Sequence, residues 1–321
     1  VVVSNVAPTL VLDDIGNIEE NDFAVATGTI TDIGRLDTHD VTIDWQDPND
    51  TEAVAFEVDA IFDITDTSTG ASSQDLFSGD TFASLSTTDD SVLTITSVDT
   101  VNGVITFTVD HQYLDDGISG PQSAGANNTT PDTSTVSVTV ADDDTASTTQ
   151  MDDVVVSNVA PTLVLDDIGN IDENDFAVAT GTMTDIGRLD THDVTIDWAD
   201  ANDTELVEFE VDAIFNITDT STGASSQDLF SGDTFASLST TDDSVLTVTS
   251  VDTVNGAFTF TVDHQYLDDG ISAPQSAGAN NTTPDTSTVS VTVADDDTAS
   301  TTQMDDVVVS NVAPTLVLDD I

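Results

Sequence analysis

Hydrophobic and polar residues alternate with a period of two along four segments of the chain. Residues 41–45 (VTIDW), 92–98 (VLTITSV), 104–109 (VITFTV) and 135–140 (TVSVTV) place β-branched or aromatic residues at every other position. This period is typical of strands that have one buried and one solvated face. No segment of useful length shows the period of a helix. The pattern therefore predicts an all-β fold.

Clusters of Asp, Thr and Gly separate these segments, as expected of the turns in an antiparallel sandwich. Val101-Asn102-Gly103 lies between two of the segments and carries the Asn-Gly signature of a tight hairpin turn, in which both central residues take positive φ. Trp45 and Phe107 are the bulky side chains that we expect in the core. The predicted fold class is all-β, built from antiparallel β-sandwiches.

The sequence repeats itself. The segment VVVSNVAPTLVLDDI begins at Val1, Val154 and Val307, which gives a period of 153 residues. Residues 1–153 and 154–306 are identical at 142 of 153 positions. We therefore predict two domains, 1–153 and 154–306, followed by the start of a third repeat at 307–321. Function is then to be sought in an array of such units.

Acidic residues dominate the charge. The chain has 62 Asp and Glu against 2 basic residues, Arg35 and Arg188, and a net charge of -60. This excludes a nucleic-acid binder and argues against docking on an anionic membrane, and it makes metal cations the expected partners. No export signal and no apolar run near the roughly 18 residues of a membrane span occur, so direct membrane insertion is not predicted.

The rest of the composition is that of a folded protein without sulfur cross-links. Apolar residues make up 38% of the chain, and the mean hydropathy is -0.03, which is enough to build a packed core. Cys is absent, which excludes disulfides, thiolate metal sites and thiol catalysis.

Four segments recur in the same order in both copies: GTITDIGRLDTHDVTIDWQD (28–47), FTVDHQYLDDG (107–117), VSVTVADDD (136–144) and VVVSNVAP (1–8 and 154–161). Together they resemble the polycystic kidney disease (PKD) domain, an immunoglobulin-like sandwich found in giant surface proteins and adhesins of bacteria and archaea. The resemblance covers 1–50 and 104–153 and leaves 51–103 as an insertion or extra strand region. It implies tandem immunoglobulin-like domains of an extracellular, cell-surface protein.

The chain departs from the family pattern in its turns. After Trp45 it has Gln46-Asp47-Pro48-Asn49, where a Gly-containing turn is usual. Thr145 stands where a Gly usually follows the last Asp of VSVTVADDD, and residues 118–134 lengthen the loop after Gly117. These departures bear on loop geometry, and hence on any ligand set carried over from the family.

Carboxylates gather in the turns of both copies. Ca²⁺ takes six to eight oxygen ligands, which loops supply well. The resemblance implies a calcium site at Asn5, Asp32 and Asp37, because PKD domains of secreted enzymes bind Ca²⁺ near the domain start and in this loop. The further candidate metal ligands are Asp115, Asp116, Asp142, Asp143, Asp144, Asp152, Asp153, Asn158, Asp185, Asp190, Asp268, Asp269, Asp295, Asp296 and Asp297. The alternative is that these residues only form turns and a solvated acidic surface.

Catalysis is not predicted. His39, His111, His192 and His264 show neither the order of a Ser-His-Asp triad nor the spacing of a zinc site. Carboxylate pairs of the kind used in glycoside hydrolysis are an alternative that composition leaves open. In a secreted archaeal chain the Asn-x-Ser/Thr sequences would be glycan acceptors, whereas in most bacteria they would be silent. They occur at Asn49, Asn127, Asn128, Asn202, Asn216, Asn280 and Asn281.

These observations predict a structural extender, in which calcium-stiffened tandem repeats form a stalk or filament. Its partners are neighbouring repeats of the same chain and, in a filament, other arrays beside it. We expect Asp152 and Asp153 to share a cation with the junction Asn158-Val159-Ala160-Pro161. The alternative is a carbohydrate- or protein-binding module with its site on 51–103 or 118–134. Salt adaptation of a halophile also fits the acidity and is compatible with either role.

Overall fold

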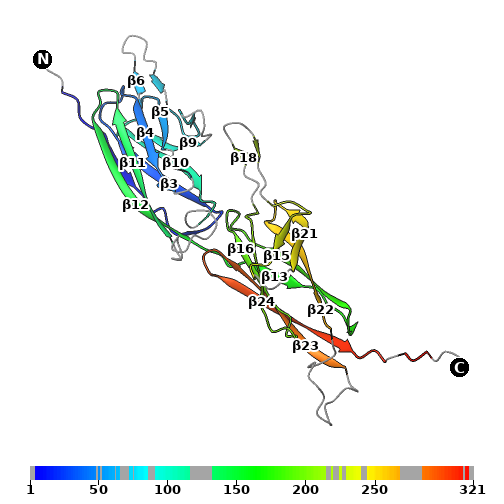
Figure 1. Ribbon diagram of the computed structural model, residues 1–321. Coiled ribbons are helices and arrows are strands. Elements are labelled where there is room, and N and C mark those ends of the chain that lie inside the picture. Colours follow the sequence, from blue (N-terminus) through cyan, green and yellow to red (C-terminus); the bar gives the residue numbers. More distant parts are fainter. Residues whose placement is uncertain are drawn as a thin grey trace. The chain divides into compact units, whose positions relative to one another are not determined.

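A computed structural model describes residues 4–47, 50, 53–61, 63–65, 72–74, 76–85, 91–115, 132–214, 218–219, 224–225, 229–239, 244–267, 284–313 and 315–317. In this part of the chain the secondary structure consists of strands and turns, as the alternation predicts. No helix among these residues is long and apolar enough to cross a membrane. The contacts divide the chain into two compact units, and the main part of the first unit ends at Asn158, before Val159 of the second (Figure 1).

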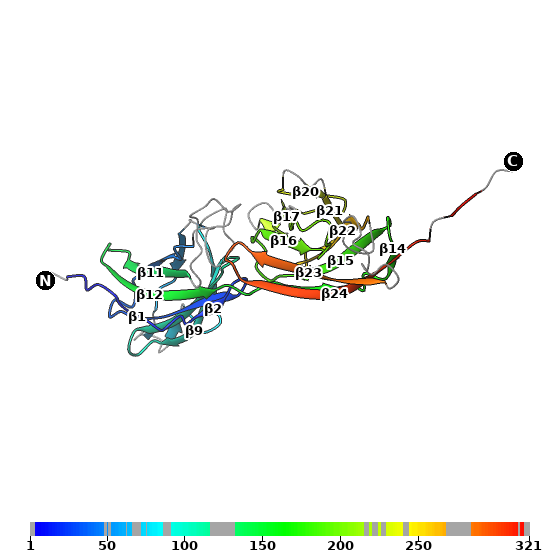
Figure 2. The same ribbon diagram turned by 60° about the horizontal axis from the view of Figure 1, so that its bottom comes forward.

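The first unit consists of two five-stranded sheets (Figure 2). One sheet has the order β1 (Thr9–Leu12), β3 (Phe23–Thr31), β10 (Val104–Gln112), β9 (Val92–Asp99) and β8 (Thr81–Ala83). The other has the order β2 (Ile18–Glu19), β12 (Ser147–Ser157), β11 (Asp132–Asp142), β4 (His39–Asp44) and β5 (Val54–Val58). A separate hairpin pairs β6 (Asp63–Thr65) with β7 (Ser72–Gln74).

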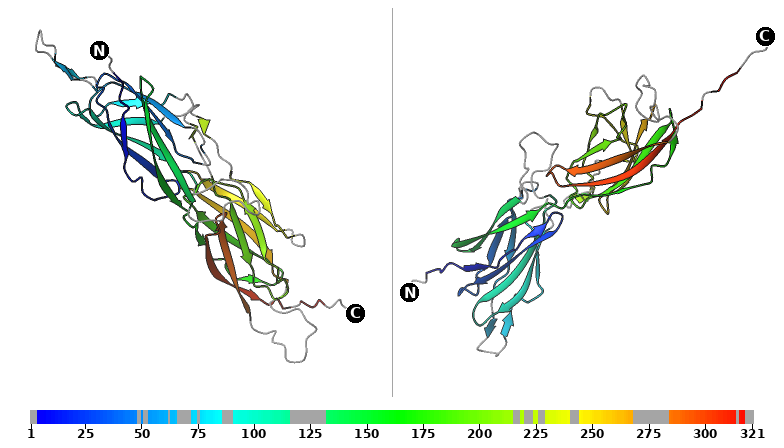
Figure 3. Two further views of the ribbon diagram at one scale, coloured as in Figure 1. Left: turned by 90° about the vertical axis from the view of Figure 1, so that its left-hand side faces the viewer. Right: turned by 90° about the horizontal axis from the view of Figure 1, so that it is seen from below.

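The second unit repeats this arrangement (Figure 3). One sheet has the order β13 (Thr162–Leu165), β15 (Phe176–Thr184), β22 (Ala257–Gln265), β21 (Val245–Asp252) and β20 (Thr234–Ala236). The other has the order β14 (Ile171–Asp172), β24 (Ser300–Ser310), β23 (Asp285–Asp295), β16 (His192–Asp197) and β17 (Val207–Val211). A small hairpin pairs β18 (Thr218–Asp219) with β19 (Ala224–Ser225).

The strand order is that of an immunoglobulin-like sandwich. In the first unit β1, β3, β10 and β9 follow the order A, B, E, D, and β12, β11, β4 and β5 follow the order G, F, C, C′. Neighbouring strands are antiparallel, apart from the short parallel pairings of β2 with β12 and of β14 with β24. Each unit is therefore an immunoglobulin-like antiparallel β-sandwich, which confirms the predicted fold class.

Each sandwich encloses one hydrophobic core. Trp45 and Phe107 are buried there, as predicted, with exposed fractions of 1% and 0%. The ring of Phe107 lies over Gly28, which faces it on β3; a Cβ on Gly28 would come within 2.3 Å of Phe107 Cζ. Tyr113 closes the end of the core by donating its hydroxyl hydrogen to the backbone oxygen of Trp45 at 2.7 Å. Tyr266 and Trp198 repeat this contact at 2.6 Å.

The last strand of the first sandwich crosses the boundary of the sequence repeat. β12 runs through residue 153 to Ser157, and its Val154 and Val156 are buried in the first core with exposed fractions of 0% and 2%. Val307 and Val309 complete the second core in the same way. The repeat in the sequence therefore ends at residue 153, whereas the folded unit ends at Asn158. Four residues, 158–161, separate β12 from β13.

Segment 51–103, expected to be an insertion or extra strand region, contributes strands β5, β8 and β9 to the sandwich. Strand β5 pairs with β4 from His39 opposite Val58 to Ile43 opposite Val54. Its Val54, Phe56 and Val58 are buried in the core, because the alternation of the strand turns every second side chain inward. Strands β8 and β9 extend the opposite sheet, so among the strands that the structure describes in 51–103 only β6 and β7 stand apart from the two main sheets.

The hairpin predicted at Val101-Asn102-Gly103 is present between β9 and β10, but it is not a two-residue turn. Asp99 pairs with Val104, and of the residues between them Gly103 alone has a positive φ, of 66°. The side chain of Asp99 stabilises this longer turn by accepting the backbone N–H of Val101 and of Asn102 at 3.0 and 3.1 Å. The prediction of positive φ at both central residues was therefore wrong.

The β11–β12 turn contains backbone strain. Thr145 has a φ of 73°, and Thr298 in the second copy has a φ of 74°. This left-handed region is unfavourable for a β-branched residue, at a cost of roughly 1–2 kcal/mol. The turn is still well bonded, since the Thr145 N–H donates to the Asp142 oxygen and the Asp142 N–H to the Ala146 oxygen, both at 2.9 Å.

Replacing Thr145 and Thr298 by Gly should therefore stabilise each unit. Gly removes the strain but costs about 0.5–1 kcal/mol in backbone entropy, so we expect a net gain of about 1 kcal/mol per unit. This corresponds to a rise of about 2–4 °C in Tm, measured by calorimetry. Thr139→Gly, in the middle of β11, is the matched control and should lower the Tm. A lower Tm in Thr145→Gly would show that the turn is not strained.

Candidate metal centre

Two acidic loops of the first unit meet at the N-terminal end of the sandwich. Asp32 and Asp37 lie in the β3–β4 loop, whereas Asp142 to Asp144 begin at the last residue of β11. The loops meet because β4 and β11 are antiparallel neighbours and the first residue of β4, His39, pairs with Asp142. Sheet register thus joins two segments that are more than 100 residues apart in the sequence.

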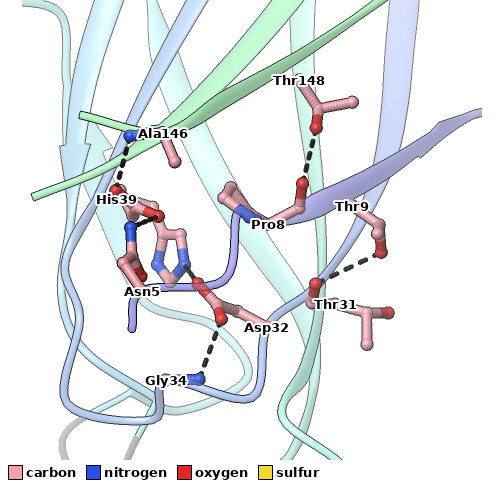
Figure 4. A network of polar contacts seen from close by, with 10 residues as sticks. Asn5, Pro8, Thr9, Thr31, Asp32, Gly34, His39, Ala146 and Thr148 are labelled. Atoms are coloured by element: carbon pink, nitrogen blue, oxygen red, sulfur yellow. Dashed lines mark hydrogen bonds and ion pairs between the residues drawn. The ribbon is translucent and has the colours of Figure 1, made fainter. Parts of the chain in front are cut away.

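Three carboxylates form the cluster. One oxygen of each of Asp32, Asp37 and Asp142 lies within 4.8 Å of the others. Asn5 reaches the same place from the segment that precedes β1, and its Nδ2 donates a hydrogen bond to Asp142 Oδ2 at 2.8 Å (Figure 4). The sequence predicted Asn5, Asp32 and Asp37 as one candidate site and the Asp142 turn as another, and the fold brings both together.

Asp32 is held in a fixed orientation. Its Oδ2 lies 3.0 Å from His39 Nε2, and its Oδ1 accepts the Gly34 N–H at 2.8 Å (Figure 4). The side chains of Asp32 and His39 are both fully buried. Sequence reasoning considered His39 only as a catalytic candidate and missed this role. The signal was the seven-residue spacing of Asp32 and His39 across a loop that ends at a strand.

The environment of the Asp37 carboxylate disfavours its ionised form. Burial raises the pKa of Asp37, and repulsion from Asp32, Asp143, Asp142 and Asp144 raises it further. The backbone comes close to this carboxylate, because a Cβ on Gly34 would lie 2.0 Å from Asp37 Oδ2. Like charges held together in a partly buried place destabilise the ionised form unless a cation neutralises them.

The second unit holds the matching carboxylates. Asp185, Asp190 and Asp295 are buried, and Asp185 Oδ2 lies 3.0 Å from His192 Nε2. Asp296 accepts the Thr191 N–H at 3.0 Å, and burial raises its pKa to about 6. Asp297 is also buried and adds a repulsive contribution to that pKa. The loop and the turn are therefore acidic in both copies, and the first carboxylate of each is buried in both: Asp32 and Asp142, and Asp185 and Asp295.

This donor set fits a hard cation. Carboxylates from separate loops and a side-chain amide are the ligands that Ca²⁺ takes in proteins. The Asn5 amide can present its Oδ1 in place of Nδ2 after a half-turn of its terminal torsion. A bound cation would also remove the repulsion that raises the pKa of Asp37.

Asp152 and Asp153 lie apart from the cluster. They are inside β12, where Asp152 pairs with Val136, six residues along β11 from Asp142. Six residues of a strand span about 20 Å. Asp152 Oδ2 accepts the Ile15 N–H at 2.8 Å, and Asp153 Oδ1 accepts the Thr135 hydroxyl hydrogen at 2.8 Å. Both carboxylates therefore hold neighbouring parts of the first unit.

The remaining candidates are spread over other parts of the chain. Asp115 is buried beyond the opposite end of β10, Asn158 is the first residue after β12, and Asn202 is in an exposed turn. The other candidate ligands and acceptor sequences lie outside the described residues: Asp116, Asp268 and Asp269, and Asn49, Asn127, Asn128, Asn216, Asn280 and Asn281.

His111 has a structural environment. Its ring stacks on Trp45 with a centroid distance of 5.1 Å and an interplanar angle of 15°, and its Nε2 lies 3.0 Å from Asp47 Oδ2. The ring of Tyr113 is perpendicular to that of His111, with a centroid distance of 4.9 Å. His264 and Trp198 have the same stacking geometry in the second unit.

Comparisons with known proteins add little to this geometry. No protein-family model matches the chain, and no curated protein matches it. A solved structure described as a marsupial T cell receptor is similar at 9% identity, over 96% of this chain and 75% of that chain, with a TM-score of 0.29. A TM-score this low carries no argument, so the immunoglobulin-like assignment rests on the strand order.

The raised pKa of Asp296 predicts that the free energy of unfolding depends on pH when a chelator keeps the protein free of metal. The native state binds a proton more tightly than the unfolded state, so the stability cost of ionised Asp296 is fully present above pH about 6 and disappears as the pH falls towards 3.8. We expect Asp296→Asn to raise the Tm at pH 7 in EDTA, with a gain that shrinks as the pH is lowered through this range.

The control for this experiment is Asp263→Asn, because Asp263 is exposed in the middle of β22. It should leave the pH profile of the Tm nearly unchanged. A difference in Tm between Asp296→Asn and the parent protein that stays constant at all pH values would contradict the desolvation argument.

Proposed function

We propose that the chain is a structural extender: tandem PKD-like units of a giant extracellular surface protein or adhesin, coupled in series as a stalk or filament. Neighbouring repeats of the same chain are its main partners. Lateral association in a filament and glycosylation belong to the same proposal. The function is mechanical, so it needs no catalytic constellation, and the described histidines are in structural pairs with Asp32, Asp47, Asp185 and Asp200.

One observation carries the proposal. The final strand of each sandwich is completed by the first residues of the next repeat, as Val154 and Val156 show in the first core. A protease or recombination break at the repeat boundary would therefore remove part of a core. Only four residues then separate β12 from β13, which leaves little length for a flexible hinge. These features favour transmission of force along the chain.

Calcium is the proposed stiffener. In the first unit Asp32, Asp37 and Asp142 would hold the ion, and Asn5 would join them from the segment that leads into β1. The bound ion would tie this segment to two loops of the sandwich. Asn158 has the same position in the repeat as Asn5, so the proposal extends to the junction before the second unit.

The alternative, a carbohydrate- or protein-binding module on 51–103 or 118–134, has less support. Aromatic side chains usually stack on sugars, but Trp45 and Trp198 are each only 1% exposed. Strands of 51–103 belong to the main sheets. Binding of the two-unit chain to defined glycans on an array would favour the alternative.

Calcium should raise thermal stability, and magnesium should do so much less, because Mg²⁺ demands a near-ideal octahedron. Extracellular modules bind Ca²⁺ with a Kd of about 0.1–1 mM. One site at about 100 times its Kd stabilises by about 2.7 kcal/mol. We therefore expect a rise of about 5–10 °C in Tm between EDTA and saturating Ca²⁺.

A variant with Asp37→Asn and Asp190→Asn sharpens this test. In EDTA it should melt at a higher temperature than the parent, because repulsion is removed. In Ca²⁺ the Tm of the variant should not rise as that of the parent does, because a ligand of the ion is missing in each unit. Asp152→Asn is the control and should keep the calcium response. Coincident melting curves of the parent in EDTA and Ca²⁺ would rule out the metal.

Calcium should also narrow the range of orientations at the junction. Small-angle scattering of the chain should fit a single orientation in Ca²⁺ and a broader ensemble in EDTA. Asp190→Asn should abolish this difference, because Asp190 is in the unit that follows the junction. Asp37→Asn is the matched control: it is the same substitution in the unit that no complete repeat precedes in this chain. Equal ensembles in Ca²⁺ and EDTA would contradict a calcium-stiffened junction.

A further inference from the structure

Each unit forms hydrogen bonds with the peptide segments on either side of it. At the C-terminal end of the second unit, the Glu173 N–H donates to the Ser310 oxygen at 2.9 Å, and Glu173 Oε1 accepts the Val312 N–H at 2.9 Å. Ser310 ends β24, and Val312 is two residues beyond it. Glu173 therefore forms hydrogen bonds both with the last residue of β24 and with the segment that follows this strand.

The turn that carries Glu173 is firmly anchored to the core. Asn174 has a left-handed φ of 69° and donates its N–H to the Tyr266 oxygen at 2.6 Å. The side-chain amide of Gln265 donates to the Asn174 oxygen at 2.9 Å. Tyr266 is in turn bonded to Trp198 in the core. Glu173 is thus presented from a turn with few conformational alternatives.

The first unit has the same turn ahead of the same linker sequence. Glu20 donates its N–H to the Ser157 oxygen at 3.1 Å, and Asn21, with a φ of 62°, donates to the Tyr113 oxygen at 2.6 Å. Glu20 is fully buried. The residues that follow Ser157 and Ser310 are both Asn-Val-Ala-Pro. The neighbour of this Glu changes from Glu19 to Asp172 between the copies, whereas the Glu itself is kept.

A second hydrogen bond forms at the N-terminal end of each unit. The Thr148 hydroxyl donates to the Pro8 oxygen at 2.6 Å, and the Thr301 hydroxyl donates to the Pro161 oxygen at 2.6 Å. Pro also fixes its own φ and holds the residue before it in an extended conformation. The last residue of the linker is therefore bound to the unit that it leads into.

From these contacts we infer that the linker between units is clamped at both ends without metal, by Glu20 at the end of the first unit and by Thr301 at the start of the second. The Glu20 carboxylate would accept the N–H of Val159, as the Glu173 carboxylate accepts that of Val312. At the other end of the linker, the backbone oxygen of Pro161 accepts the hydroxyl hydrogen of Thr301. Asn158 and Ala160 lie beside these two points. The inference deepens the proposed function, on which it rests, by giving the junction a stiffness that remains when calcium is removed.

The clamp is tested by distance distributions between spin labels, measured in EDTA. Since the chain has no Cys, Ser97→Cys and Ser250→Cys give one label at the same exposed place in each unit. Glu20→Ala should broaden the distribution, and Glu20→Gln, which keeps the accepting oxygen, should restore it. Glu173→Ala is the matched control, because it follows the second unit, and it should have no effect. Far-UV circular dichroism checks that both units remain folded.

A local measurement keeps the inference testable if Glu20→Ala does not fold. Glu173→Ala should speed hydrogen exchange of the Val312 amide about tenfold, which equals about 1.4 kcal/mol, whereas Glu173→Gln should leave it near the parent rate. An unchanged Val312 exchange rate, or equal broadening by Glu20→Ala and Glu20→Gln, would overturn the clamp. Because both experiments are done in EDTA, their failure would leave the calcium response of the proposed function untouched.

Discussion

The antiparallel pairing of β4 with β11 is the constraint on which the rest of each unit depends. It aligns Val41 and Ile43 with Val140 and Val138 in the core, and it ends with His39 opposite Asp142. The same register therefore builds the hydrophobic core and brings two acidic loops together at its edge. A shift by one residue would turn the core side chains outward and also separate the loops. In this fold the packing of the core holds together carboxylates that repel one another.

The sequence repeat and the folded unit differ by a few residues, so neighbouring copies share the residues of one core. Val154 and Val156 belong by sequence to the second copy and by packing to the first. Substitutions between the copies also respect packing. Ile30 and Ile105 face each other across β3 and β10, and both are replaced in the second core, by Met183 and Phe258. The two copies thus differ at facing positions of the core, and they also differ at exposed positions such as Gln46, which is Ala199 in the second copy.

Sequence reasoning predicted those parts of the molecule that depend on local pattern. The alternation of Val and Thr gives β9, β10 and β11 within a few residues, because each strand has one buried face. It did not predict that β5 completes a sheet, although Val54, Phe56 and Val58 alternate with Ala55 and Glu57, because the family resemblance left 51–103 outside its pattern. The sequence predicted the acidic loops as candidate metal sites. That the β3–β4 loop and the β11–β12 turn lie together depends on the register of β4 and β11, which no local pattern reveals. His39 was missed for the same reason, and the left-handed Thr145 runs against its own propensity.

The charge and the short edge strands together limit how arrays can meet side by side. The edges of the two main sheets in the first unit are β1, β8, β2 and β5, which have 4, 3, 2 and 5 residues. Edges this short offer few unpaired backbone groups to a neighbouring sheet, which protects near-identical domains from pairing with each other. A net charge of -60 adds repulsion that is long-ranged only at low ionic strength. In the array that we propose, lateral contact would therefore require screening salt or bridging cations, whereas the linker joins neighbouring units along the chain. The same acidity would keep such arrays apart in dilute buffer and would permit bundles in saline or calcium-rich surroundings.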